Sequence, residues 1–194
     1  MQKYIAEAIG TFALTLIVGL SLAGTFPVST PVLAGLTLLL FVYSVGHLSG
    51  ANLNPAITIG AWSIGKIKLE DAIGYLIAQC FGAALALALI SATIGLPTLT
   101  VSSDWMIGVA ELIGAFFFAF GVAAVIYGKG SHHLSGVMVG GSLLFGIALA
   151  ALMGSTGLLN PAVALGVGSF NLMYVFGPII GAVLGMQAYK YLID

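Results

Sequence analysis

Apolar residues dominate the chain and are interrupted at intervals by glycine, proline and charged residues. Cutting the sequence at these interruptions leaves six long apolar segments, near residues 4–24, 31–47, 70–94, 106–127, 134–153 and 173–192. Each has roughly the 17–25 residues that an α-helix needs to cross the hydrocarbon core of a bilayer. We therefore predict six transmembrane helices, and we read the first as a membrane helix and not as a removed signal peptide.

Two shorter apolar pieces follow the second and the fifth segments, near residues 54–62 and 160–170. Neither is long enough to cross a membrane. Both begin with the same tripeptide, which is formed by Asn54, Pro55 and Ala56 in the first piece and by Asn160, Pro161 and Ala162 in the second. Because Asn is a preferred N-cap and Pro is favoured at the first helical position, each piece is predicted to be a half-helix that begins at membrane depth.

The two halves of the chain repeat one pattern. Glu7 precedes Asn54 by 47 residues, and Glu111 precedes Asn160 by 49 residues. With three spans in each repeat, an odd number, the second repeat enters the membrane from the opposite side, as in inverted repeats whose functional elements meet at the midplane. We predict a single transmembrane domain over residues 1–194, built from inverted repeats 1–97 and 104–194.

The composition supports this prediction. The chain of 194 residues is 60% hydrophobic and 6% charged, with a mean hydropathy of +1.18. Soluble domains carry about 25% charged residues, so the composition indicates an integral protein of the lipid bilayer. The net charge of −1 leaves no basic face for nucleic acid. A single cysteine, Cys80, allows neither an intrachain disulfide nor a thiolate metal site.

The basic residues predict the orientation in the membrane. All are lysines, and in the six-span topology they share one side with both termini: Lys3, Lys66, Lys68, Lys129 and Lys190. The positive-inside rule makes that side cytoplasmic. The short chain without a targeting segment suggests the cell (inner) membrane of a prokaryote.

Asn54 and Asn160 are the strongest candidates for function. A side-chain amide is polar but uncharged, so it can orient a passing hydroxyl or water without holding it tightly. The N-terminus of each half-helix adds about half a positive charge, and two such ends facing each other repel cations at the midplane. Each Asn is also expected to cap its helix.

Glu7 and Glu111 fall inside predicted spans, and two interpretations of them are open. A proton relay or cation-coupled transporter uses such carboxylates. Alternatively, each accepts hydrogen bonds from the unwound backbone before a half-helix, which their equivalent positions favour. Without a nucleophile or metal cluster beside them, we expect no enzyme. Gln79 and His47 are further polar groups at membrane depth that could support a pore, and His47 is placed either at an inner vestibule or in a structural hydrogen bond.

The ordered set of motifs resembles the aquaporin (major intrinsic protein) family of water and small-solute channels, over essentially the whole chain. The resemblance rests on both Asn-Pro-Ala boxes, on Glu7 and Glu111, on Ala78-Gln79, and on the sequence Ser-Gly-Ala-Asn-Leu-Asn-Pro-Ala after Gly46-His47. It implies an all-α membrane protein with an aquaporin-like right-handed bundle of six transmembrane helices and two re-entrant half-helices. It also implies a homotetramer with one pore per subunit, passive conduction and no cofactor.

The chain departs from the family pattern at the outer constriction. Aquaporins usually have an arginine directly after the second box, and this chain has Val163 there. Counting without gaps to the other usual positions gives a ring of Ala34, Ala148, Gly157 and Val163. A ring this small and apolar predicts a wide passage for glycerol, urea, neutral metalloid acids, ammonia or hydrogen peroxide, as well as water. Bulky neighbours, among them Phe41, Tyr43 and Phe145, could narrow it again.

Two other functions remain open on the sequence. One is an ion-coupled secondary transporter that uses Glu7 or Glu111. The other is a structural membrane protein whose pore is closed.

Overall fold

The computed structural model describes residues 1–24, 26–95, 104–129 and 132–194, and the regular structure within them is helical. Six helices are long and apolar enough to cross a membrane: α1 (Gln2–Ala23), α2 (Thr30–Ser49), α4 (Leu69–Thr93), α5 (Trp105–Ile126), α6 (Ser135–Leu152) and α8 (Leu172–Ile193). Two helices are too short to do so: α3 (Pro55–Ser63) and α7 (Pro161–Gly166). A 3₁₀ turn, η1 (His132–Leu134), precedes α6. The prediction of an all-α membrane protein with six spanning helices is confirmed.

The helix ends lie close to the predicted ones. The largest differences in the six spans are two residues, at Gln2 of α1 and at Ser49 of α2. The second half-helix is the exception, because it ends at Gly166 and not near residue 170. Gly168 has a φ of 74°, a left-handed conformation that ends a helix, and Asn171 then caps the start of α8. The predicted repeat end at residue 97 lies outside the described residues.

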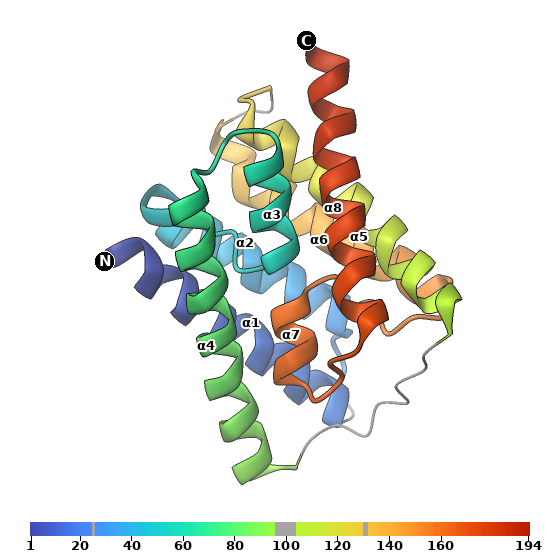
Figure 1. The fold of residues 1–194 in the computed structure, drawn as a ribbon. Helices are drawn as coiled ribbons and strands as arrows, with labels where there is room; N and C mark the ends of the chain where they lie inside the picture. The colour runs from blue at the N-terminus through green and yellow to red at the C-terminus, as the bar shows by residue number, and fades with distance from the viewer. Residues whose placement is uncertain (25, 96–103, 130–131) are drawn as a thin grey trace.

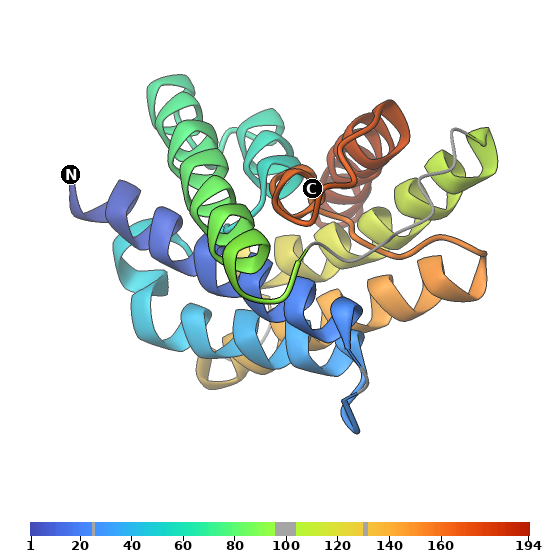
Figure 2. The ribbon, with the colours of Figure 1, turned by 90° about the horizontal axis from the view of Figure 1, so that it is seen from below.

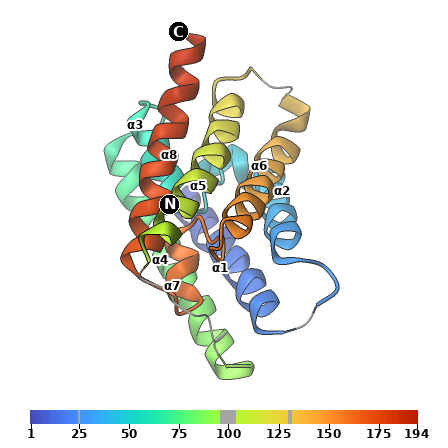
Figure 3. The same cartoon turned by 90° about the vertical axis from the view of Figure 1, so that its right-hand side faces the viewer.

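The two half-helices fill the interior from opposite ends. Figure 1 and Figure 3 show α3 in the upper half of the bundle and α7 in the lower half. Seen from below, α7 lies between α4 and α8 (Figure 2). Around them, α1 packs on α4, α5 packs on α8, and α2 packs on α6 across the two halves. The N-terminal ends of α3 and α7 therefore meet near the middle of the molecule.

Glycines allow the paired spans to approach closely. A Cβ atom added at Gly82 of α4 would lie 2.2 Å from the Ala8 carbonyl oxygen of α1. The second half has the same contact, since a Cβ atom at Gly181 of α8 would lie 2.1 Å from the Leu112 carbonyl oxygen of α5. Small residues at helix crossings let the backbones pack directly against each other in the membrane.

Replacing Gly82 by Ala should lower the free energy of unfolding by about 1–3 kcal/mol, because the new methyl group meets rigid backbone and α1 must move. Thermal unfolding in detergent measures the change. Gly141→Ala in α6 is the control, because a Cβ atom there would have no atom within 4 Å. Equal melting temperatures for the two variants would contradict the close packing of α1 on α4.

Candidate functional site

The loop before each half-helix is held in an unusual backbone conformation. Leu53 and Leu159, the residues just before the two capping asparagines, both have a φ of 51°. Few residues other than glycine adopt positive φ, and holding one there costs on the order of 1–3 kcal/mol unless its surroundings compensate. The two loops therefore need specific partners.

Glu7 supplies those partners in the first loop. Its Oε1 accepts hydrogen bonds from the Ser49 hydroxyl at 2.6 Å and the Asn52 amide at 2.9 Å. Its Oε2 accepts from the Leu53 amide at 2.7 Å and from Nε2 of Gln79 at 2.8 Å. The Glu7 side chain is fully buried. Nε2 of Gln79 also donates to the Thr58 hydroxyl at 2.9 Å, whereas the Ser49 hydroxyl and the two backbone amides depend on Glu7 for an acceptor at membrane depth.

Glu111 has the same position in the second loop. Its Oε1 accepts from the Ser155 hydroxyl and from the Leu158 amide at 3.0 Å, and its Oε2 accepts from the Leu159 amide at 2.7 Å. This side chain is also fully buried. Both carboxylates thus make hydrogen bonds to unwound backbone, as in the supporting interpretation.

The glycine three residues after each Glu makes room for the strained leucine. A Cβ atom at Gly10 would lie 2.4 Å from a methyl carbon of Leu53, and one at Gly114 would lie 2.7 Å from a methyl carbon of Leu159. Within one helical turn, the Glu thus accepts a hydrogen bond from the leucine amide, and the Gly leaves space for the leucine side chain. This pairing gives a physical reason for the repeated Glu-x-x-Gly spacing in the two halves.

Asn54 and Asn160 connect the two halves through their amides. Nδ2 of Asn54 donates to the Leu159 carbonyl at 2.9 Å, and Nδ2 of Asn160 donates to the Leu53 carbonyl at 2.9 Å. Each strained leucine is therefore held by a Glu of its own half at its N–H and by an Asn of the other half at its C=O.

The same two asparagines cap their half-helices. Oδ1 of Asn54 accepts from the Ala56 amide at 2.8 Å, and Oδ1 of Asn160 accepts from the Ala162 amide at 3.0 Å. Because an amide NH₂ carries two hydrogens and the carbonyl takes one, each Asn keeps a second N–H. Pro55 and Pro161, at the first helical position, lack the N–H that would have no helical partner there.

A narrow cavity of about 20 Å³ lies beside these asparagines. It has room for roughly one water molecule. Its polar lining consists of Thr30, Asn52, Asn54, Thr156 and Asn160, and no charged residue is among the described residues that line it. The rest of the lining is apolar, so this is an uncharged cavity with side-chain amides in its lining.

The cavity includes three of the four positions predicted for the outer ring. Ala34, Gly157 and Val163 line it, and Ala148 does not. Ile147 lines it in place of Ala148, which is a shift of one residue and a rotation of about 100° around the helix. Gly157 packs directly against Ile147, since a Cβ atom there would lie 2.7 Å from the Ile147 carbonyl oxygen. The ring is therefore less open than four small residues would make it.

Other predicted positions lie elsewhere. His47 is exposed on α2 and lines neither this cavity nor the inner one described below, so its role stays a prediction. Phe41, Tyr43 and Phe145 do not narrow the cavity either. Bulky side chains that the sequence analysis missed do so: Leu14, Leu38, Phe118 and Leu143. The sequence does contain a clue to two of them. Leu14 and Phe118 each follow a loop-binding Glu by seven residues, about two helical turns, and so lie on the same helix face as that Glu.

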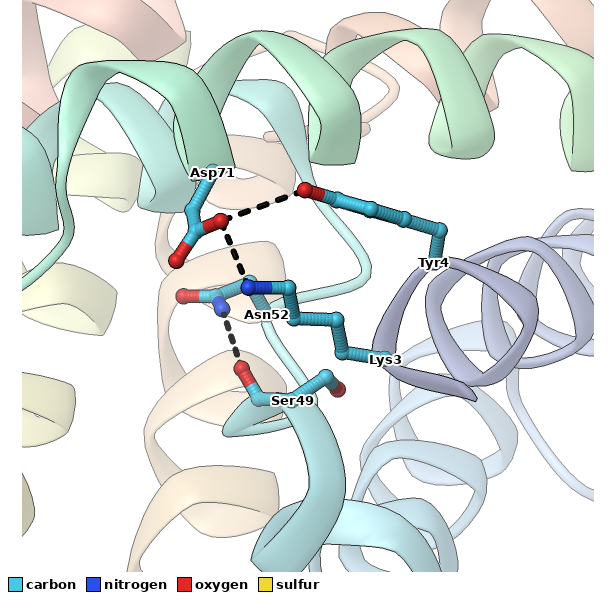
Figure 4. Close-up of polar contacts among 5 residues, drawn as sticks. All are labelled: Lys3, Tyr4, Ser49, Asn52 and Asp71. Carbon is cyan, nitrogen blue, oxygen red and sulfur yellow. Dashed lines mark hydrogen bonds and ion pairs between the residues drawn. The ribbon is translucent and has the colours of Figure 1, made fainter. Parts of the chain in front are cut away.

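A wider cavity of about 380 Å³, which we call the inner cavity, is lined in part by α3 and by the chain on both sides of it. Lys66 and Ile67 line it beyond α3, and Asn52 lines it before α3. Figure 4 shows Asn52 with its Nδ2 donating to the Ser49 carbonyl, at 3.3 Å.

An ion pair joins α1 to the start of α4 in the same region. Nζ of Lys3 lies 2.6 Å from Oδ1 of Asp71, which also accepts a hydrogen bond from the Tyr4 hydroxyl at 3.2 Å (Figure 4). Both charged side chains are about one-third exposed, so the pair contributes little to stability. It places Lys3 beside the α3–α4 connection, which carries Lys66 and Lys68.

Sequence comparison identifies related proteins. The profile of the major intrinsic protein family matches residues 1–189. The chain is 30% identical to Aquaporin NIP1-1 of Arabidopsis thaliana over 98% of this chain and 73% of that protein. It is 30% identical to Aquaporin AqpM of Methanothermobacter marburgensis over 78% of this chain and 71% of that protein.

Comparison of folds agrees with the sequence match. The X-ray structure of the aquaglyceroporin from Plasmodium falciparum superposes with a TM-score of 0.69 at 21% identity, and the match covers 100% of this chain and 95% of that one. The profile match over nearly the whole chain, the identity with aquaporins and the shared fold all lead to one conclusion. The chain belongs to the major intrinsic protein family, and it is an integral membrane channel and not an enzyme.

Proposed function

We propose that this chain forms a passive channel for water and small uncharged solutes. The observation that carries the proposal is the pair of asparagines at the ends of two half-helices, each with one N–H left beside an uncharged cavity. Such groups can replace hydrogen bonds of a passing water or hydroxyl, and the two helix ends oppose the entry of cations. The roles of Asn54 and Asn160 as pore residues, and of Glu7, Glu111 and Gln79 as their supports, are part of this proposal.

The outer ring supports permeation by solutes other than water. Ala34, Gly157 and Val163, with Ile147 in place of Ala148, offer no charge and no side-chain donor. Glycerol, urea, neutral metalloid acids, ammonia and hydrogen peroxide are uncharged and small, and they are the candidate solutes. The aquaporin and aquaglyceroporin relatives support both water and larger neutral solutes as cargo.

The orientation and assembly are proposed on separate grounds. The α3–α4 connection and the C-terminal ends of α5 and α8 lie at one end of the bundle (Figure 1). Lys66 and Lys68 belong to the connection, Lys129 follows α5, and Lys190 is in the last turn of α8. The positive-inside rule supports a cytoplasmic location for this end and for both termini, in a prokaryotic cell membrane. A homotetramer, the assembly implied by the family resemblance, is the proposed form in the bilayer.

Stopped-flow light scattering on proteoliposomes tests the channel proposal. Shrinkage in an osmotic step should be faster than in protein-free liposomes, and re-swelling with glycerol or urea should follow. The flux should rise linearly with the solute gradient and should not depend on proton or sodium gradients. Saturating, gradient-coupled uptake would instead indicate a transporter, and no flux through folded protein would indicate a closed, structural role.

A further inference from the structure

Three residues line both cavities of the molecule. Leu38 of α2, Asn52 of the first loop and Phe118 of α5 border the narrow cavity at the asparagines and also the inner cavity. The Leu38 and Phe118 side chains are each 1% exposed, so neighbouring atoms enclose them almost completely. We call these three residues the inner septum, because they line both cavities.

The two halves of the protein carry unequal side chains at matching positions of α1 and α5, and of these two only Phe118 borders both cavities. Leu14 and Phe118 occupy matching positions, each seven residues after the Glu that binds its loop. Seven residues are about two helical turns, so each lies on the same face as its Glu and about 10 Å farther along the helix. The first half has a leucine at this position and the second half has a phenylalanine, one of the largest fully buried side chains of the protein.

The inner septum is also poor in hydrogen-bonding groups. Leu38 and Phe118 have no side-chain donor or acceptor, and Asn52, which donates one N–H to the Ser49 carbonyl, is its one polar side chain. A water molecule that crosses the septum can remain bonded to the waters before and after it. A larger solute gives up several hydrogen bonds at once and must displace the phenyl ring, and both requirements raise its barrier.

We infer that Phe118, which borders both cavities together with Leu38, is the constriction that selects neutral solutes by size, in place of the outer ring of small residues. This inference rests on the proposed channel function and names the residue that limits the size of the permeating solute. The outer ring then decides which chemical groups are tolerated, and the septum decides how large the solute can be.

The test compares glycerol and water permeability in proteoliposomes for the wild-type chain and Phe118→Leu, which makes the two halves equal at this position. The ratio of glycerol to water permeability should rise by about tenfold, which requires the glycerol barrier to fall by only about 1.4 kcal/mol relative to that of water. Leu38→Ala opens the septum from α2 and should shift the ratio in the same direction. It serves as the second measurement if Phe118→Leu does not fold.

Phe117→Leu is the matched control, because Phe117 is the adjacent residue of the same helix and its side chain is 43% exposed on the outside of the subunit. Its permeability ratio should equal that of the wild type. Unchanged ratios in folded Phe118→Leu and Leu38→Ala, while the wild type still conducts, would overturn the inference and leave the channel function standing. If neither water nor glycerol crosses any folded variant faster than protein-free liposomes, the proposed function itself fails.

Discussion

Replacing Val163 by Arg should lower glycerol and urea permeability by at least about tenfold, a rise of about 1.4 kcal/mol in the barrier, while water permeability falls much less. Val163 is 2% exposed and lines a cavity of about 20 Å³, so the longer side chain has to occupy the passage. Its fixed N–H groups favour small hydrogen-bonding molecules such as water over larger ones. Stopped-flow re-swelling of proteoliposomes measures the change.

Val163→Met separates the effect of charge from that of volume, since it adds length without fixed donors. We expect Val163→Met to slow water and glycerol together, and Val163→Arg to change their ratio. Glycerol permeability in folded Val163→Arg equal to that of the wild type would show that Val163 does not face the permeating solute. In that case the assignment of the outer ring would be wrong.

Replacing Glu111 by Gln should lower the free energy of unfolding by about 3 kcal/mol, a typical loss when a buried charged hydrogen-bond acceptor is removed. One carboxylate oxygen becomes an NH₂ group, which cannot accept from the Leu159 amide or from Leu158 and Ser155. Leu159, held at a φ of 51°, then loses the bond that compensates its backbone strain. Because the Leu159 carbonyl also holds Asn54, permeability should fall with stability.

Thermal unfolding in detergent, with permeability measured on the same preparations, tests this prediction. Glu7→Gln should behave similarly, since the Leu53 amide and Asn160 are linked to it in the same way. Glu70→Gln, at an exposed position in the first turn of α4, is the control and should leave both quantities unchanged. A folded, stable Glu111→Gln that loses only ion-dependent uptake would instead favour the transporter.

The architecture could be predicted from the sequence because its causes are local. Backbone groups in hydrocarbon must be paired within the segment, so long apolar runs become helices, and Asn-Pro marks the start of a new one. The hydrogen bonds of Glu7 and Glu111 to the loop backbone have the same cause, since unwound loops at membrane depth need acceptors. The end of α7 was harder to predict, because it depends on the left-handed conformation of Gly168.

The lining of the passage could not be predicted in the same way. Ile147, and not Ala148, faces the narrow cavity, and the contact of Gly157 with the Ile147 carbonyl accompanies that rotation of α6. The number of residues between an Asn-Pro-Ala box and a position in another helix does not fix how that helix is rotated. An error of one residue in that position turns the side chain by about 100° around the helix.

The sequence alone thus determined the class of protein, the six spans and the two half-helix starts, because these depend on local pairing of backbone groups and on bilayer thickness. Only the tertiary structure decided which side chains meet in the passage. Leu38 and Phe118 lie 80 residues apart in the chain and border the same two cavities. That shared position depends on how α2 and α5 are rotated by packing against all their neighbours, which no single segment specifies.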